Sequence, residues 1–450
     1  ARRLGNIDAD TDQAFAWQPF LVLDPSINAF ALPGGYIGVH LGMIAITATP
    51  DELASVLAHE LSHVTQRHIA RGIAPQQRAS MAAVATMLLG IFAAARSNNA
   101  DVANAAIAGS QGAAIQSRIN YTRGFEREAD RVGFGVLVAA GYSPASMGDM
   151  FEKMQTALRL SDQSSFPYLR DHPVTTERIS EARDRMLLVE HPRPDLPTLE
   201  HALMAARARV LMTEGTQGLQ RLAGAATSPL RGDRAAPPGT AGISLLYAEA
   251  LASSRLNEPA RAERAAAQAL AREQALPQPD PRAGRDLGLL LAEVRVAAKQ
   301  PVAALQALDA LPPLAEGASE RPELLLRAQA TLDAWRADPA RAPALRQMTE
   351  TLQTWVALRP QDALAWETLS HTSEALGLKL RALRAAAEAR AALGDLGGAV
   401  DRLRAAQAAS RTARGQDFIE ASIIDARMRQ LLAQRRELAL QARAEGRQPE

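Results

Sequence analysis

From about residue 198 to the end of the chain, apolar residues recur at helical spacing in segments of roughly 12 to 16 residues. Proline or glycine interrupts this pattern near Gly239, Pro277–Pro281, Pro312–Pro313, Pro339, Pro360 and Gly394. Short amphipathic helices cannot bury their apolar faces alone, so each helical hairpin must pack on its neighbour. The pattern therefore predicts an array of stacked hairpins, whose curved surface suits the binding of a partner.

Two fragments of this region are similar to tetratricopeptide (TPR) repeats. One has the P-x-x-A-x-x-W-x-x-L spacing that opens such a repeat, with Leu358, Pro360, Ala363, Trp366 and Leu369. The other, Leu393–Ala399, is typical of the turn between the two helices of a repeat. Because the fragments do not keep a strict period of about 34 residues, an irregular helical bundle is the alternative.

The first 190 residues or so have a different pattern. They contain two candidate strands, Phe20–Leu23 and Ala29–Val39, the second interrupted at Pro33-Gly34-Gly35. The stretch 191–197 is rich in proline, which removes backbone donors and forbids a continuing helix. We therefore predict a mainly α-helical chain with an α+β domain at 1–190, a linker at 191–197 and a TPR-like helical domain at 198–450.

Composition limits the chemistry that the first domain can perform. The chain has 50 basic and 49 acidic side chains, and this balance does not favour nucleic-acid binding. It has no cysteine, which excludes disulfides, thiol nucleophiles and Cys-ligated metal sites. Any bound metal must therefore rest on histidine and carboxylate side chains, and five of the eight histidines lie in the first 190 residues.

The H-E-x-x-H motif His59–His63 is the strongest sign of a metal site. Thr49-Pro50-Asp51-Glu52 has the pattern of a capping box with proline at the first helical position, so we predict a helix from there to about Arg71. Four residues advance a helix by about one turn, and both imidazoles then project from one face and can bind one cation. Glu60 lies beside them, at the position from which a carboxylate can reach an activated water.

Two histidines leave such a metal short of a ligand. His40 and His68 have no obvious partner in the sequence, so a carboxylate is the economical choice. The segment E-R-E-A-D, residues 126–130, lies on a helix that is predicted to end near Gly141. Glu126 and Asp130 stand one turn apart, so one can ligate while the other orients a ligating imidazole. Spacing alone does not choose between Glu126 and Glu128.

Taken together, these motifs resemble one known family. H-E-L-S-H, the E-R-E-A-D segment, Asn28–Gly35 upstream and Asp171-His172-Pro173 downstream are similar to BepA/YfgC-type periplasmic zinc metalloproteases, which are related to the membrane peptidase HtpX. The resemblance covers residues 20–190. It implies a zincin-like metalloprotease fold with a small sheet, and it implies one Zn²⁺ per chain.

The resemblance also implies roles for particular residues. His59, His63 and Glu126 would bind zinc, Glu60 would be the catalytic base, and Asp130 would orient a ligand. Asn28, Ala29 and Phe30 would lie on an edge strand that binds an extended substrate, although an ordinary hairpin accounts for the same residues.

His172 precedes Pro173, in a loop that can swing over the metal. In BepA-like proteins the matching histidine is associated with the fourth zinc position, which would hold the enzyme latent. The alternatives are that it polarises the substrate carbonyl or is an ordinary surface-loop histidine. Arg178, one helical turn into the next helix, is a candidate partner of an active-site carboxylate.

Between the two metal-binding helices, the segment from residue 79 to about 116 is rich in Ala, Gly and Asn and must loop out near the site, so we predict a helical lid. Its apolar part, 79–95, is too short for a strongly apolar membrane span, and peripheral contact with a membrane is the alternative. The chain begins A-R-R-L-G-N without a secretory signal, as expected of a mature chain whose signal peptide has been removed.

The leading hypothesis is a zinc endopeptidase whose helical repeats recruit a protein partner. By resemblance it would be a periplasmic protease and chaperone in outer-membrane protein assembly, acting on protein or peptide substrates. The rival is a latent protease that works mainly as a TPR chaperone or adaptor, with the zinc site closed by His172.

Overall fold

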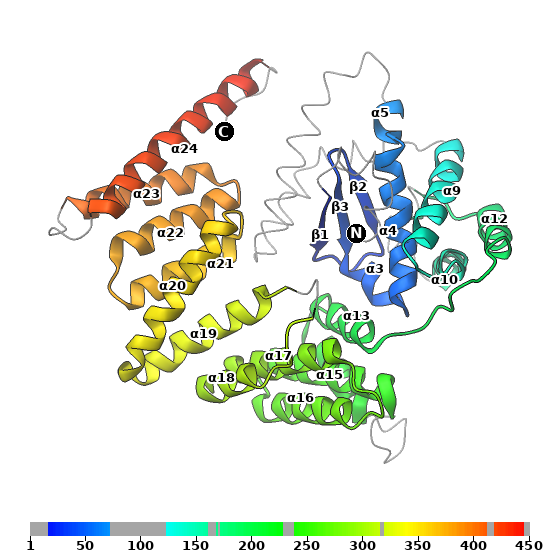
Figure 1. Cartoon of the computed structure of the whole chain (residues 1–450), viewed down its shortest axis with the longest axis horizontal. Helices are drawn as coiled ribbons and strands as arrows, with labels where there is room; N and C mark the ends of the chain where they lie inside the picture. The colour runs from blue at the N-terminus through cyan, green and yellow to red at the C-terminus, as the bar shows by residue number, and fades with distance from the viewer. Residues whose placement is uncertain are drawn as a thin grey trace. The chain divides into compact units, whose positions relative to one another are not determined.

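The computed structural model describes residues 17–72, 123–160, 168–169, 172–227, 238–315, 319–411 and 418–444. Figure 1 shows these residues as a small β-sheet with flanking helices, followed by a long succession of helices. The prediction of a mainly α-helical chain with a small sheet is confirmed. The described part divides into two compact units, one reaching to Leu290 and the other beginning at Leu291, within the same helix.

The sheet contains three strands, β1 (Gln18–Val22), β2 (Ala29–Leu32) and β3 (Tyr36–His40), in the order β1-β3-β2. The β2 strand pairs antiparallel with β3, and β1 pairs parallel with β3. Gly34 and Gly35 have φ of 94° and 90°, a conformation that glycine adopts without steric cost, and they close the turn between β2 and β3. The two predicted strand regions and their interruption are thus confirmed.

Two helices follow the sheet, α3 (Leu41–Ile46) and α4 (Pro50–Thr65). The Thr49 hydroxyl caps α4 by accepting a hydrogen bond from the Glu52 amide at 3.0 Å, as the capping box predicts. The Glu52 carboxylate in turn accepts a hydrogen bond from the amide of Ala48, the residue before the N-cap, so Thr49 satisfies one helix-end donor and Glu52 holds the chain that enters the helix.

The prediction that this helix continues to about Arg71 is wrong. It ends at Thr65, and a separate short helix, α5, spans His68–Gly72. Arg67 between them has φ of 55°, in the left-handed region that an α-helix cannot contain. The amides of Gln66 and Arg67 bond back to carbonyls of the last turn of α4, which satisfies that helix end and redirects the chain.

Three more helices complete the surroundings of α4: α9 (Arg123–Ala139), α10 (Ala145–Leu160) and α12 (Thr176–Leu187). Figure 1 shows α9 alongside α4. Gly133 lets them approach closely, since a Cβ there would lie 3.0 Å from the Ala58 carbonyl oxygen. One apolar core joins the sheet to these helices, and it includes Ile37, Leu61, Leu137, Met150 and Ala182.

The same compact unit continues into the helices α13 (Leu199–Leu211), α14 (Thr216–Gly224), α15 (Gly239–Arg255), α16 (Pro259–Gln274) and the first part of α17 (Pro281–Ala297). Helix α13 packs on α3. His201 Nε2 lies 3.0 Å from the Thr47 hydroxyl, and Arg209 donates to the Ala45 carbonyl at 3.1 Å. Residues 191–197 form neither helix nor strand, as the proline-rich stretch predicts. The domain boundaries themselves stay a prediction.

The second unit contains α18 (Pro301–Asp309), α19 (Arg321–Ala337), α20 (Ala342–Leu358), α21 (Ala363–Ala375), α22 (Lys379–Ala392), α23 (Leu396–Ser410) and α24 (Phe418–Ala444). Each of these helices packs against the next one in sequence. Trp366 and Leu369 of the TPR-like fragment are buried, and Leu393–Asp395 form the turn between α22 and α23. Nearest-neighbour packing of this kind is typical of a helical solenoid.

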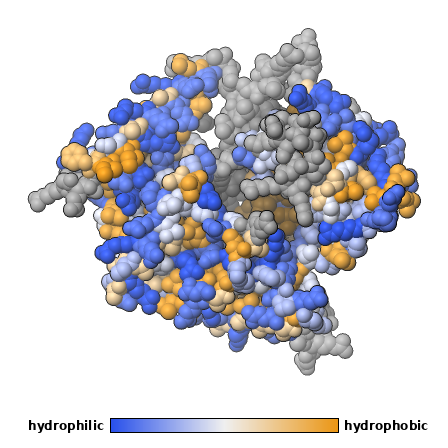
Figure 2. All heavy atoms as spheres, in the orientation of Figure 1, coloured by the Kyte–Doolittle hydropathy of each residue, from blue (hydrophilic) through white to orange (hydrophobic). Residues whose placement is uncertain are grey.

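On the face shown in Figure 2, hydrophobic side chains are interspersed with hydrophilic ones, as expected where each amphipathic helix buries one apolar stripe. Among the described helices, none is long and apolar enough to cross a bilayer. The predicted lid and the segment 79–95 with its proposed membrane contact lie outside the described residues.

Candidate metal centre

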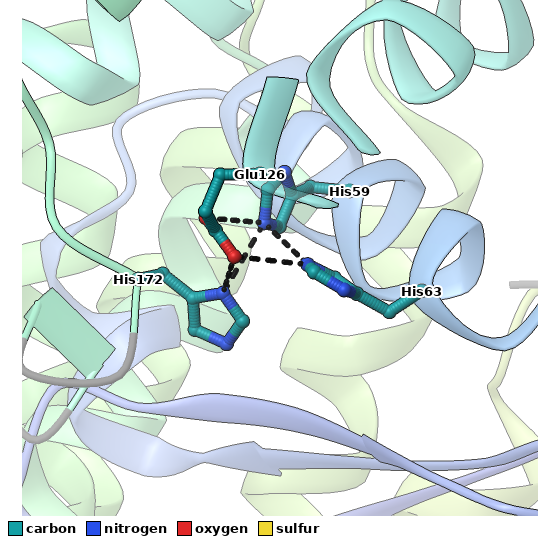
Figure 3. A group of neighbouring side chains, drawn as sticks. All are labelled: His59, His63, Glu126 and His172. Carbon is teal, nitrogen blue, oxygen red and sulfur yellow. Dashed lines mark hydrogen bonds and ion pairs between the residues drawn. The ribbon is translucent and has the colours of Figure 1, made fainter. Parts of the chain in front are cut away.

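Four buried side chains from three separate parts of the chain converge on one point. They are His59 and His63 of α4, Glu126 of α9, and His172 of the segment before α12, and Figure 3 shows them pointing toward one another. Each offers one ligand atom, and the four atoms lie within 4.8 Å of one another. The α4–α9 packing brings Glu126 to the histidines, because both helices present these side chains at their shared face.

The distances between donor atoms suit a tetrahedral cation. His59 Nε2 lies 3.0 Å from His63 Nε2 and 3.5 Å from a Glu126 carboxylate oxygen. His63 Nε2 lies 3.5 Å from the other Glu126 oxygen. A tetrahedron with metal–ligand bonds of about 2.0–2.1 Å has edges of about 3.3 Å.

The chemistry of this donor set also fits a metal. A proton can lie between only one pair of converging lone pairs, whereas a cation satisfies all of them at once. Burial, with the charges of His59 and His172, holds the pKa of His63 well below its ordinary value, which favours the neutral imidazole that metals bind.

Asp130 and Arg178 hold the outer side of His59. His59 Nδ1 lies 2.9 Å from Asp130, so an Nδ1–H donated there leaves Nε2 free to face the cluster. Arg178 binds both oxygens of Asp130, at 2.7 and 2.8 Å, and reaches Glu126 at 3.0 Å. Burial opposes ionisation of Asp130, but the bonds from His59 and Arg178 outweigh it and lower its pKa. The same bond to Asp130 raises the pKa of His59 to about 9 against the effect of burial.

Glu60 is buried beside the cluster, and among the described residues its carboxylate oxygens accept no close hydrogen bond, although the Tyr168 hydroxyl is near enough to favour the charged form. His172 Nε2 lies 3.7 Å from Oε1 of Glu60. Burial raises the pKa of Glu60. A carboxylate with free lone pairs and a raised pKa has the properties of a general base.

His172 lies in the cluster and is not an ordinary surface-loop residue. Its Nδ1 is 3.0 Å from Glu126 and 3.4 Å from His59 Nε2. Tyr168, a fully buried residue that sequence reasoning missed, stacks on the imidazole with ring centroids 4.8 Å apart. Its amide donates to the Ile27 carbonyl near the sheet, and no local sequence pattern signals this long-range contact.

The structure resolves the choice between the two glutamates of the E-R-E segment. Glu126 joins the cluster, whereas Glu128 lies outside it and binds His68 Nε2 at 3.0 Å. His68 stays outside the cluster, as the choice of a carboxylate ligand expects, but it has a partner that the sequence did not reveal, because the turn at Arg67 carries it back toward α4 and α9. His40 also has partners, with Nδ1 2.8 Å from the Ser26 hydroxyl.

The predicted substrate strand lies at the edge of the sheet formed by the described residues, since β2 pairs only with β3 there. Asn28, Ala29 and Phe30 are all buried. The Phe30 ring covers Gly38, where an added Cβ would lie 2.3 Å from it, and the Asn28 carbonyl accepts from the His40 amide. The Phe30 side chain thus packs on the sheet, and any contact with a substrate falls to the backbone.

Comparison with known proteins shows which proteases the first part of the chain is similar to. Residues 5–186 match the family model described as peptidase family M48. A putative beta-barrel assembly-enhancing protease of Vibrio cholerae is 40% identical over 195 residues, and a beta-barrel assembly-enhancing protease of Escherichia coli is 35% identical over 192. The mitochondrial metalloendopeptidase OMA1 of Arabidopsis thaliana is 30% identical over 166 residues.

The two bacterial alignments cover 43% of this chain and 38% of the length of each relative. The alignment with OMA1 covers 37% of this chain and 31% of that relative. Similarity to these relatives is thus shown for less than half of each protein. Residues 5–186 of this chain, which include the four residues of the metal cluster, are therefore similar to peptidase family M48.

Proposed function

We propose that this domain is a zinc-dependent endopeptidase that binds one Zn²⁺ through His59, His63 and Glu126. The observation that carries the proposal is the buried convergence of these three donors beside Glu60, whose carboxylate oxygens accept no close hydrogen bond among the described residues. Histidine and carboxylate donors are the ligands of catalytic zinc in proteins without a cysteine at the site.

The roles of the side chains follow from their positions. Zinc in this site would supply Lewis acidity, which lowers the pKa of a water and polarises a peptide carbonyl. Glu60 accepts the proton of the water as its oxygen adds to the carbonyl carbon, and passes that proton to the amine as the C–N bond breaks. Asp130 fixes the orientation of His59, and Arg178 keeps Asp130 charged. An extended substrate would add to the backbone of Asn28 and of the first residues of β2, Ala29 and Phe30.

Metal analysis of the purified chain tests this function. We expect about one zinc per chain and cleavage of a casein-type substrate, with both lost in His59→Ala because the variant removes a buried ligand. His191→Ala, which removes an exposed histidine, is the matched control and should keep both. A wild-type chain that lacks stoichiometric zinc after purification without chelators would overturn the proposal.

The position of His172 supports a latent resting state, in which this side chain takes the fourth zinc position. Its Nδ1 belongs to the converging donor set, and Tyr168 stacks against its ring. Catalytic zinc sites keep one position open for water or substrate, so a fourth protein ligand would block the reaction. This arrangement also favours the second candidate function, that of an adaptor whose metal site stays closed.

His172→Phe should raise basal casein cleavage about tenfold or more, because it opens the fourth zinc position and keeps a ring to stack on Tyr168. His191→Phe, at an exposed position, should leave cleavage unchanged. Initial rates at equal zinc content are the measurement. A fall in the rate would instead assign His172 to the groups that act on the substrate.

We further propose that the helices after residue 198 form TPR-like repeats that bind a protein partner. The packing of α18 to α24, each on the next in sequence, supports this, since stacked hairpins present an extended surface. Two proteins that are similar to the first part of this chain are named for enhancing beta-barrel assembly. By this similarity we propose that the chain acts in the periplasm, in quality control of outer-membrane protein assembly.

A further inference from the structure

His68 occupies a position that the proposed mechanism does not use. It is buried, and its Nδ1 lies 2.9 Å from Nδ1 of His63, on the side of that ring opposite the cluster. Its other nitrogen, Nε2, lies 3.0 Å from a carboxylate oxygen of Glu128. The ring stacks on Phe125 of α9, with centroids 4.6 Å apart and an angle of 14° between the planes.

The break after α4 makes this contact possible. In a continuous helix, two residues five positions apart point in directions that differ by about 140°. The left-handed conformation of Arg67 ends α4, and α5 then starts at His68 itself. His68 is thereby turned back onto the last turn of α4, where it meets His63.

The distances specify where the protons lie. A metal on His63 Nε2 requires the proton of that ring on Nδ1, and this N–H points at His68 Nδ1. His68 can accept the bond only if its own proton lies on Nε2, from which it is donated to Glu128. Glu128 can act only as an acceptor here, because Arg71 also donates to it at 2.9 Å. One assignment of protons satisfies every bond in the series.

We propose that His68 and Glu128 are positioning residues for the metal ligand His63, through a hydrogen-bond relay from carboxylate to imidazole to imidazole. The inference rests on the proposed zinc site. Asp130 performs the matching task for His59 directly, and the relay through His68 does so for the second imidazole. Outer partners of this kind fix the tautomer and the ring orientation of a ligand, and their loss commonly lowers metal affinity 10- to 100-fold.

Zinc affinity of the full chain, measured by competition with a chromophoric chelator, tests the relay. His68→Phe keeps a ring that can stack on Phe125 but removes both nitrogens, and it should lower the affinity about 10- to 100-fold. His68→Asn loses the ring and the bond to Glu128 but keeps an acceptor near the position of Nδ1, so it should lower the affinity about tenfold, like Glu128→Ala, and by less than His68→Phe. A purely structural role of the ring predicts the opposite order for the two variants.

Glu128→Ala tests the far end of the relay and should lower zinc affinity about tenfold. The matched control is Glu177→Ala, which removes an exposed carboxylate that pairs with Arg127 and should change the affinity less than twofold. The visible absorption of the cobalt-substituted chain gives a second readout. It should change in His68→Phe and Glu128→Ala, because the His63 ring turns, and stay unchanged in Glu177→Ala.

The outcomes separate this inference from the function on which it rests. If the wild type binds zinc and His68→Phe binds it with the same affinity, the relay is overturned but the metal centre is not. The same conclusion follows if His68→Asn loses more affinity than His68→Phe. A wild-type chain that binds no zinc would overturn both.

Discussion

Glu60→Gln should reduce peptide cleavage by about three orders of magnitude while the zinc content stays at one per chain. Among the described residues, the Glu60 carboxylate lies beside the cluster without being one of its donors, so it can take the proton of the attacking water, and loss of a positioned general base commonly costs 10²- to 10⁴-fold. The amide of glutamine has nearly the same shape but no comparable basicity. Because Glu60 is not one of the four converging donors, metal binding should persist.

Single-turnover cleavage and metal analysis of the same preparation measure this effect. Glu152→Gln removes the charge of a half-exposed carboxylate that pairs with Arg183, and it should keep full activity. If Glu60→Gln retains cleavage above a tenth of the wild-type rate, another group is the base. If the wild type and the variant are equally inactive yet both support assembly of a client protein, the adaptor function replaces the protease.

Arg178→Met should destabilise the part of the chain that matches peptidase family M48 by about 3–5 kcal/mol in the zinc-free chain. Arg178 is the buried counterion of Asp130 and Glu126, with side-chain exposures of 5%, 1% and 5%. Removing one partner of a buried ion pair leaves an uncompensated charge, whose cost exceeds the worth of the original pair. Methionine keeps much of the side-chain length, which limits the packing loss over the Phe151 ring.

Hydrogen exchange of peptides from α9 and α12 measures this change locally, so that unfolding of the other helices does not enter the result. Arg127→Met, which breaks an exposed pair with Glu177 on the same two helices, should cost less than about 1 kcal/mol. If both variants lose the same amount of hydrogen-exchange protection, the buried ion pairs of Arg178 contribute no more to stability than the exposed Arg127–Glu177 pair. Added zinc should recover part of the loss in Arg178→Met, because the metal neutralises Glu126.

The features that could be predicted from the sequence depend on neighbouring residues. The cap of α4 requires only Thr49, Pro50 and Glu52, and the common face of His59 and His63 requires only helical geometry. The β2–β3 turn follows from Gly34 and Gly35, which adopt positive φ freely. Such local interactions act in the same way in any fold, so sequence patterns report them well.

The end of α4 and the contact of His68 could not be predicted from the sequence, and for one physical reason: both depend on contacts with residues far away in the chain. Nothing near Arg67 marks it as the end of α4, since arginine is a good helix former and rarely adopts positive φ. The left-handed turn lets His68 bury its ring between His63 and Phe125, and this tertiary contact is absent from any local window. Because His68 lies there, the Glu128 carboxylate binds His68 and stays outside the metal cluster.

The sequence by itself determined the chemistry that is available: no thiols, one helix with two histidines on one face, a nearby carboxylate, and a helical chain beyond. Only the tertiary structure decided which groups meet. Packing of α9 on α4 at Gly133 places Glu126 at the histidines, and the segment before α12 adds His172. A metal centre is a convergence of side chains far apart in the chain, and the packing of whole helices, rather than residue spacing, determines that convergence.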